Sequence, residues 1–180
     1  MFRAHRRHRL EAYLKRLYGY AFSLTHDADR AEDLVHDTIV KALAARRVPH
    51  DEPAYRAWLF KILRNVMVDQ TRKPMSRESE LVVDELENES DWNTGSETQQ
   101  VNALTVRIAF DRLTLAQREI LAAIDVAGLT YSEVSELFDV PMGTVMSRIS
   151  RARAALYKLV QETTSDGKIE FLAIRKTGAR

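Results

Sequence analysis

The sequence has 180 residues, enough for one domain or two small ones. Its 27 Lys and Arg residues nearly balance 26 Asp and Glu residues, and it contains no cysteine, which excludes disulfides and thiolate metal sites. No apolar run is long enough to span a bilayer, so we expect no direct membrane insertion and a cytoplasmic location.

Charge is distributed unevenly along the chain. Residues 1–75 carry 15 basic and 9 acidic residues, residues 76–99 carry 1 and 8, and residues 100–180 carry 11 and 9. The middle segment is also polar and lacks hydrophobic periodicity, which indicates a flexible linker rather than a packed element. We therefore expect two modules of net positive charge with an acidic connector between them.

Two helices are predicted in the first part of the basic segment. Apolar residues recur at helical spacing over 10–22. After a polar interruption, Asp29 is the expected N-cap of a second helix that runs to about Arg46, because Glu32 stands three residues later as in a capping box.

The start of this second helix carries Asp33, His36 and Asp37. Carboxylates there interact favourably with the helix dipole, so helix stabilisation alone would explain them. A carboxylate pair can also serve acid–base catalysis, although no nucleophile, metal ligand or phosphate loop stands nearby. A docking patch for a basic partner is the third interpretation. We predict no metal site and no cofactor, because no complete set of ligands stands together in the sequence.

A third helix is predicted over about 54–72, after a loop at 47–53. Its apolar face contains Trp58, which we expect in the core rather than as a stacking platform. Its other face is basic and would suit phosphate contacts, while Asn65 would either hydrogen-bond a base edge or cap a neighbouring turn. The candidate DNA-binding residues of this helix are Arg56, Lys61, Arg64, Asn65, Arg72 and Lys73.

Helical periodicity returns from about Val101, and Thr114 with Gln117 predicts a capped helix that ends near Gly128. The stretch 129–156 then predicts two helices joined by a tight turn. A capping box opens the first of them, and a proline separates the two: Thr130, Glu133 and Pro141. The second helix has a buried apolar stripe at Val145, Ile149, Ala152 and Leu156.

Residues 142–160 include no acidic residue, so the outer face of this second helix is polar and basic. Such a pair of helices is typical of a helix-turn-helix whose second helix enters the major groove of DNA. An αα-hairpin with a solvated basic face would show the same pattern.

Three segments together carry a family resemblance: Asp29–Leu43, Tyr55–Lys73 and Leu113–Leu156. In this order and spacing they resemble the bacterial sigma-70 factors of the extracytoplasmic-function (ECF) group, which keep only regions 2 and 4. The resemblance implies an all-α fold of two small helical domains joined by a flexible acidic linker. The implied division is region 2 at 1–75, the linker at 76–100, region 4 at 101–162 and a tail at 163–180.

The resemblance also implies roles for single residues. Asp33, His36 and Asp37 fall where the family binds the clamp helices of the polymerase β′ subunit, and His36 replaces a more usual glutamine. The third helix and the loop before it would open the minus-ten element and hold a flipped base in a loop pocket close to Asn65. The residues that would read the minus-thirty-five element are Gly143, Thr144, Met146, Ser147 and Arg151, while Arg148 would contact phosphate. Met146 departs from the family, which often has Arg or Lys there.

We therefore expect a sigma factor that binds core RNA polymerase through its β′ and β subunits and directs promoter-specific transcription initiation in a stress or extracytoplasmic response. Promoter DNA and a controlling anti-sigma factor are the other expected partners, and no enzymatic activity is expected. The alternative is a stand-alone helix-turn-helix transcription regulator. It would account for 129–156 but leave 29–73 unexplained.

Overall fold

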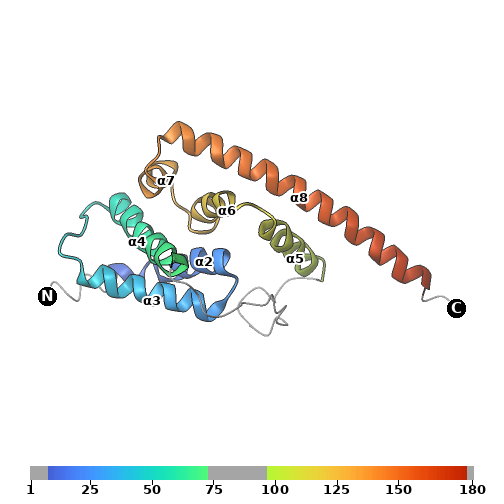
Figure 1. Cartoon of the computed structure of the whole chain (residues 1–180), viewed down its shortest axis with the longest axis horizontal. Helices are drawn as coiled ribbons and strands as arrows, with labels where there is room; N and C mark the ends of the chain where they lie inside the picture. The colour runs from blue at the N-terminus through green and yellow to red at the C-terminus, as the bar shows by residue number, and fades with distance from the viewer. Residues whose placement is uncertain (1–7, 73–96, 178–180) are drawn as a thin grey trace. The chain divides into compact units, whose positions relative to one another are not determined.

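The computed structural model describes residues 8–72 and 97–177, with side chains at 8–70 and 102–164. Every regular element in these ranges is helical, which confirms the all-α prediction (Figure 1). The helices are α2 (Leu14–Thr25), α3 (Ala28–Ala44), α4 (Glu52–Arg72), α5 (Glu97–Asp111), α6 (Leu115–Leu121), the π-helix η1 (Ala122–Val126), α7 (Tyr131–Phe138) and α8 (Met142–Thr177). The predicted linker lies outside the described residues up to 96, and its last positions already belong to α5.

The described helices divide into two compact units. The first contains α2, α3, α4, α6, η1, α7 and the first turns of α8 up to Ser150. The second contains α5 and α8 from Arg151 onward, where Arg112 and Glu162 form an ion pair of 3.2 Å. Helices that precede and helices that follow the predicted linker therefore share the first unit.

The apolar core of the first unit includes residues of α2 and α4. Leu17 and Leu59 are fully buried, and Tyr20 packs edge-on against Phe60 with 5.6 Å between the ring centroids. Trp58, expected in the core, is half-buried. Full burial of a large apolar side chain contributes about 1.5–3 kcal/mol, so these contacts hold the helices together more strongly than exposed ion pairs do.

The start of α3 differs from the prediction. The N-cap is Asp27 rather than Asp29, and its carboxylate accepts the backbone N–H of Arg30 at 2.9 Å. His26 ends α2 in the left-handed region with a φ of 53°, and this sharp reversal places the next residue at the cap position. Asp29 lies exposed in the first turn of α3, where its carboxylate interacts with the helix dipole.

We expect Asp27→Ala to lower the free energy of unfolding by about 1 kcal/mol, because the first turn of α3 loses a side-chain acceptor. Urea titration followed by circular dichroism measures the change. Asp29→Ala is the matched control, and it should cost only about 0.3–0.5 kcal/mol through the helix dipole. Equal losses in the two variants would contradict the cap assignment.

The helix that follows Thr114 is not the single regular helix that was predicted. After α6, the N–H of Ala127 donates to the carbonyl of Ala122 at 2.8 Å, which closes the wider turn of η1. Gly128 then adopts a φ of 68°, a left-handed conformation that glycine accepts without strain, and the element ends there as predicted. A single π-turn leaves no periodic signal in a sequence, so only its end could be predicted.

The helix-turn-helix geometry is confirmed. The Thr130 hydroxyl accepts the N–H of Glu133 at 3.3 Å, and the Glu133 carboxylate accepts the N–H of Thr130 at 2.7 Å, which completes the predicted capping box. Helix α7 ends at Asp139, whose φ of 53° lies in the left-handed region, and α8 starts directly after Pro141. The predicted stripe of α8 is buried at Val145, Ile149 and Ala152 and half-buried at Leu156.

Candidate functional site

The polar cluster of α3 lies on an exposed face of the helix. Asp33, His36 and Asp37 are all exposed, and their spacing of three and four residues places them side by side. Gln70 of α4 donates its amide N–H to the Asp37 carboxylate at 3.3 Å. Val40, which is 53% exposed, lies on the same face. The sequence analysis did not include Val40 in this face, although its spacing of four and three residues from His36 and Asp37 indicates it. An acidic face with an exposed apolar residue suits a basic protein partner.

The sequence predicted that Arg56 and Arg64 lie on an exposed outer surface of α4, and the structure differs for both residues. The Nε of Arg56 donates to the Glu133 carboxylate of α7 at 2.7 Å. The Nε of Arg64 donates to the Glu119 carboxylate of α6 at 3.2 Å. Both arginines are half-buried, because helices that follow the linker cover this face of α4.

The other predicted DNA-binding residues of the third helix differ in their positions. Lys61 and Asn65 are exposed on α4. Arg72 ends α4, but its side chain lies outside the described side chains, and Lys73 lies outside the described residues. The exposed basic surface that the structure describes on this helix therefore centres on Lys61.

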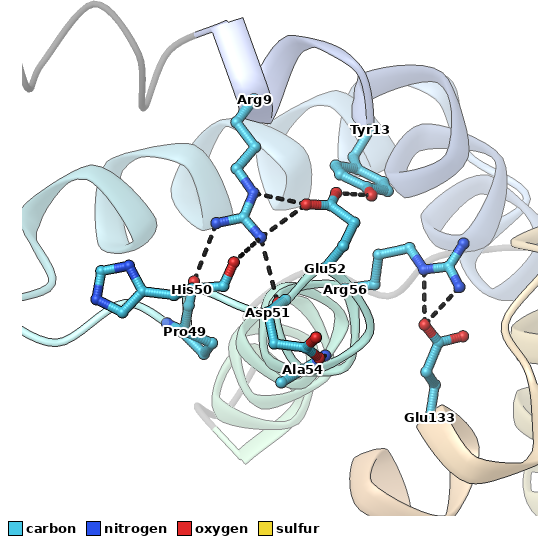
Figure 2. Close-up of polar contacts among 9 residues, drawn as sticks. All are labelled: Arg9, Tyr13, Pro49, His50, Asp51, Glu52, Ala54, Arg56 and Glu133. Carbon is cyan, nitrogen blue, oxygen red and sulfur yellow. Dashed lines mark hydrogen bonds and ion pairs between the residues drawn. The ribbon is translucent and has the colours of Figure 1, made fainter.

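A cluster at the loop between α3 and α4 was not predicted. Figure 2 shows Arg9 reaching from the turn before α2 to this loop. Its guanidinium donates to three carbonyl oxygens at 3.0–3.2 Å, those of Pro49, His50 and Asp51. It also forms an ion pair of 2.7 Å with Glu52. The five donors of a guanidinium suit such a set of acceptors, so Arg9 fixes the shape of the loop.

Tyr13 belongs to the same cluster, where its hydroxyl donates to Glu52 (Figure 2). Burial, together with the hydrogen bond to Glu52 and the negative charge there, raises the pKa of Tyr13 to about 12. The hydrogen bond from Tyr13 and the charge of Arg9 hold the pKa of Glu52 below its ordinary value. The cluster is thus most stable with a protonated phenol and an ionised carboxylate.

Alkaline pH should weaken this cluster. Because the pKa of Tyr13 is higher in the folded chain than its ordinary value of 10.0, stabilisation present below pH 10 is lost as the pH rises toward 12. We expect the melting temperature of Tyr13→Phe to fall less than that of the unaltered protein between about pH 9 and about pH 11.5. Burial also raises the pKa of Tyr20, which is present in both proteins. The melting temperature of Tyr13→Phe should therefore still fall with pH, but by less than that of the unaltered protein. Identical pH profiles from calorimetry would contradict this role of Tyr13.

A hollow of about 720 Å³ lies beside the same loop. The side chains that line it include Arg9, Arg46, Arg47 and the aromatic ring of Tyr55. Asn65 is not among its lining residues, because it stands about 20 Å further along the axis of α4 than the start of that helix. The expected loop pocket close to Asn65 stays a prediction, and the hollow beside the loop is lined by arginines instead.

The predicted reading residues lie in the first turns of α8. All except the half-buried Thr144 are exposed: Gly143, Met146, Ser147, Arg148 and Arg151. The Ser147 hydroxyl donates to the carbonyl of Thr144 at 3.0 Å. A Cβ built on Gly143 would meet nothing within 4 Å, so packing within the chain does not require a glycine there.

The described residues were also searched for membrane-spanning helices and for clusters of metal-binding side chains. Among the described residues, no helix combines the length and the apolar character that crossing a membrane requires. Within the same ranges, no three His, Asp or Glu side chains gather where they could hold a metal ion.

Comparison with known protein families accounts for most of the chain. Residues 10–77 match the family described as Sigma-70 region 2, and residues 105–156 match Sigma-70, region 4. The first match contains the exposed acidic face of α3 and the whole of α4, and the second contains the helix-turn-helix. The two regions follow each other in the predicted order.

Individual relatives indicate which group of the sigma-70 family the chain is most similar to. The ECF RNA polymerase sigma factor EcfG of Rhodopseudomonas palustris is 34% identical over 80% of this chain and 78% of the relative. SigL of Mycobacterium tuberculosis, also an ECF RNA polymerase sigma factor, is 29% identical over 81% of this chain and 83% of the relative. The chain belongs to the ECF group of the sigma-70 family of RNA polymerase sigma factors. Proteins of this family are transcription initiation factors and not enzymes.

A solved structure supports the same assignment. The sigma factor RpoE from Bartonella quintana, solved in complex with the anti-sigma factor NepR, has 29% sequence identity and a TM-score of 0.65. The similarity covers 86% of this chain and 96% of that chain.

Proposed function

We propose that Asp33, His36 and Asp37 bind core RNA polymerase, against its β′ subunit. Their exposure on one face of α3, within the part that matches sigma-70 region 2, is the observation that carries this proposal. Carboxylates attract a basic partner surface, and Val40 adds apolar area to the contact. His36 stands where the family more often has glutamine.

We also propose that the chain contacts promoter DNA through two sets of residues. The set for the minus-ten element is Arg56, Lys61, Arg64, Asn65, Arg72 and Lys73. The set for the minus-thirty-five element is Gly143, Thr144, Met146, Ser147, Arg148 and Arg151. The exposed first turns of α8 and the match to region 4 support the second set. Met146 cannot make a bidentate contact to guanine, so we expect it to touch a thymine methyl group instead.

Control by an anti-sigma factor is the third part of the proposal, and it includes an acidic linker at 76–100 that lets region 2 and region 4 separate. The similarity to RpoE of Bartonella quintana, solved with NepR, supports an anti-sigma partner. Such a chain would work in the cytoplasm, where RNA polymerase acts, in a stress or extracytoplasmic response.

Run-off transcription with core polymerase on a promoter library tests the proposed function. A sigma factor yields defined transcripts only when the chain and core polymerase are both present, and the active templates reveal the promoter motif. The alternative, a stand-alone helix-turn-helix regulator, would bind DNA without core polymerase and would support no transcription with it.

A further inference from the structure

Arg9 is the residue on which the loop between α3 and α4 converges. Figure 2 shows three successive carbonyl oxygens, those of residues 49–51, around its guanidinium, at 3.0–3.2 Å. Arg9 precedes residues 10–77, the part of the chain that matches Sigma-70 region 2, so the match assigns it no role. One side chain from outside the matched part thus holds three consecutive residues of a loop inside it.

The guanidinium of Arg9 is itself held in place. It forms an ion pair of 2.7 Å with Glu52, and it lies over the ring of Tyr55, 3.9 Å from the ring centroid. Tyr55 is 3% exposed, and the side chain of Arg9 is 20% exposed, so both belong to the packed part of the first unit. Because Glu52 balances its charge and carbonyl groups accept from its donors, Arg9 suits an anchor of the loop better than a contact to DNA.

Two basic residues of the loop, Arg46 and Arg47, lie between two fixed points. One is the end of α3, and the other is the set of carbonyl groups that Arg9 holds, which begins at Pro49. Only residues 45–48 connect the two, and a proline also restricts the backbone of the residue before it. Arg46 and Arg47 are exposed and line the hollow beside the loop. Their charges are therefore presented at a defined place.

The helix dipole offers a simpler explanation of these two residues. Basic side chains beyond the C-terminus of α3 interact favourably with its dipole, and that alone would account for Arg46 and Arg47. Such an interaction needs no ordered loop, however, and it leaves the four hydrogen bonds of Arg9 without a function. Binding of a charged ligand does benefit from an ordered loop, because ordering a mobile loop on binding costs conformational entropy.

We propose that Arg9 is a positioning residue for promoter DNA, which holds the loop so that Arg46 and Arg47 meet phosphates of the unpaired strand at the minus-ten element. This inference rests on the proposed minus-ten function of α4, the helix that begins directly after the loop. The two exposed guanidinium groups attract the strand by charge and by release of its counterions. Arg9 touches no DNA, and it acts by lowering the entropic cost of ordering the loop when the strand binds.

Limited proteolysis of the free chain tests whether Arg9 orders the loop. Trypsin cleaves after arginine, so Arg46 and Arg47 are themselves the reporters, and mass spectrometry identifies the cuts. We expect initial cleavage there to rise at least about fivefold in Arg9→Ala and at least about threefold in Arg9→Lys, since lysine lacks the fork that reaches three carbonyl groups. Arg9→Lys keeps the charge beside Glu52 and carries the test if the alanine variant does not fold. Arg16→Ala and Arg16→Lys, the same changes at an exposed position of α2, should leave the rate unchanged.

The holoenzyme tests the contact to DNA. Anisotropy measures its affinity, over a range of salt concentrations, for a labelled single strand that carries the minus-ten motif found with the promoter library. We expect Arg46→Ala together with Arg47→Ala to reduce the slope of log K against log salt by about 1.4, since each phosphate contact of a single strand contributes about 0.7. Arg9→Lys should weaken binding about fivefold and leave the slope unchanged, because the bound loop makes the same contacts. A merely structural role of Arg9 would instead weaken binding to core polymerase, which should stay unchanged.

The outcomes separate failure of this inference from failure of the proposed function. Unchanged cleavage of the loop in Arg9→Lys, or unchanged affinity of that variant for the strand, would overturn the positioning role. A slope that falls in Arg9→Lys would make Arg9 a phosphate contact and would overturn it as well. An unchanged slope in the double variant of Arg46 and Arg47 would overturn the contact of the loop to phosphate. All of these results leave run-off transcription by the unaltered chain intact, whereas its absence with core polymerase would refute the proposed function itself.

Discussion

Replacing Asp37 by lysine is expected to weaken binding of the chain to core RNA polymerase by at least about 100-fold. Loss of one partner from a charge pair buried in an interface costs about 2–5 kcal/mol, and lysine adds repulsion against a basic partner. Asp37 is exposed on α3, and among the side chains that the structure describes its carboxylate accepts a hydrogen bond from Gln70. The substitution should therefore leave the fold intact while it removes binding.

A polymerase pull-down and fluorescence anisotropy of a labelled chain measure this effect, with circular dichroism as the check on folding. Glu11→Lys is the matched control, since Glu11 is 64% exposed and lies outside the face of α3. It makes the same charge change and should leave affinity within about twofold, as distant surface charges interact weakly at physiological salt. Equal binding by the Asp37→Lys variant and the unaltered chain would contradict the docking role of α3.

The sequence predicted those features whose signals are local. Apolar spacing located the helices of both halves, and the pairing of Thr130 with Glu133 placed the start of α7 at the residue where it begins. The buried stripe of α8 followed from the same periodicity. Each of these signals lies within a few residues of the element that it predicts, so no knowledge of tertiary contacts was needed.

Long-range contacts left no comparable signal. Glu133 fits its capping box so well that nothing in the sequence indicated a second bond to Arg56. Arg9 stands in a basic N-terminal segment that gives no sign of its bonds to three carbonyl groups some 40 residues later. The error over the cap of α3 has a different cause, because Asp27 and Asp29 both suit an N-cap and the left-handed turn before them decides between the two.

The carboxylate partners of the α4 arginines change how the basic residues of this helix are interpreted. A basic side chain on a helix predicts affinity for phosphate only if its charge is free, and Arg56 and Arg64 already have carboxylate partners. By contrast, Lys61 on the same helix is exposed. We therefore expect the free chain to present much less positive potential on α4 than its composition suggests, and the recognition helix α8 to be the more accessible DNA-binding surface.

Substitution of Gly143, in the first turn of the recognition helix α8, is expected to have the second large effect, a loss of affinity for promoter DNA. We expect Gly143→Ala to reduce affinity for a promoter that carries the minus-thirty-five element by about tenfold, and Gly143→Gln by at least about 100-fold. The first turn of a recognition helix contacts the base edges, so added side-chain atoms there occupy space that the groove needs. Within the chain the same atoms meet open space, and alanine favours a helix over glycine, so stability should stay equal or rise by up to about 1 kcal/mol.

Anisotropy of the holoenzyme on promoter DNA with an intact or scrambled minus-thirty-five element measures the loss, and urea titration of the free chain measures stability. Ala103→Gln is the control, because it adds a similar side chain at an exposed position of α5 and should leave affinity unchanged. The losses should vanish on the scrambled promoter, where the contact to bases is already absent. Unchanged affinity across glycine, alanine and glutamine at position 143 would mean that the first turn of α8 does not enter the groove, and promoter reading would then have to come from another surface of the chain.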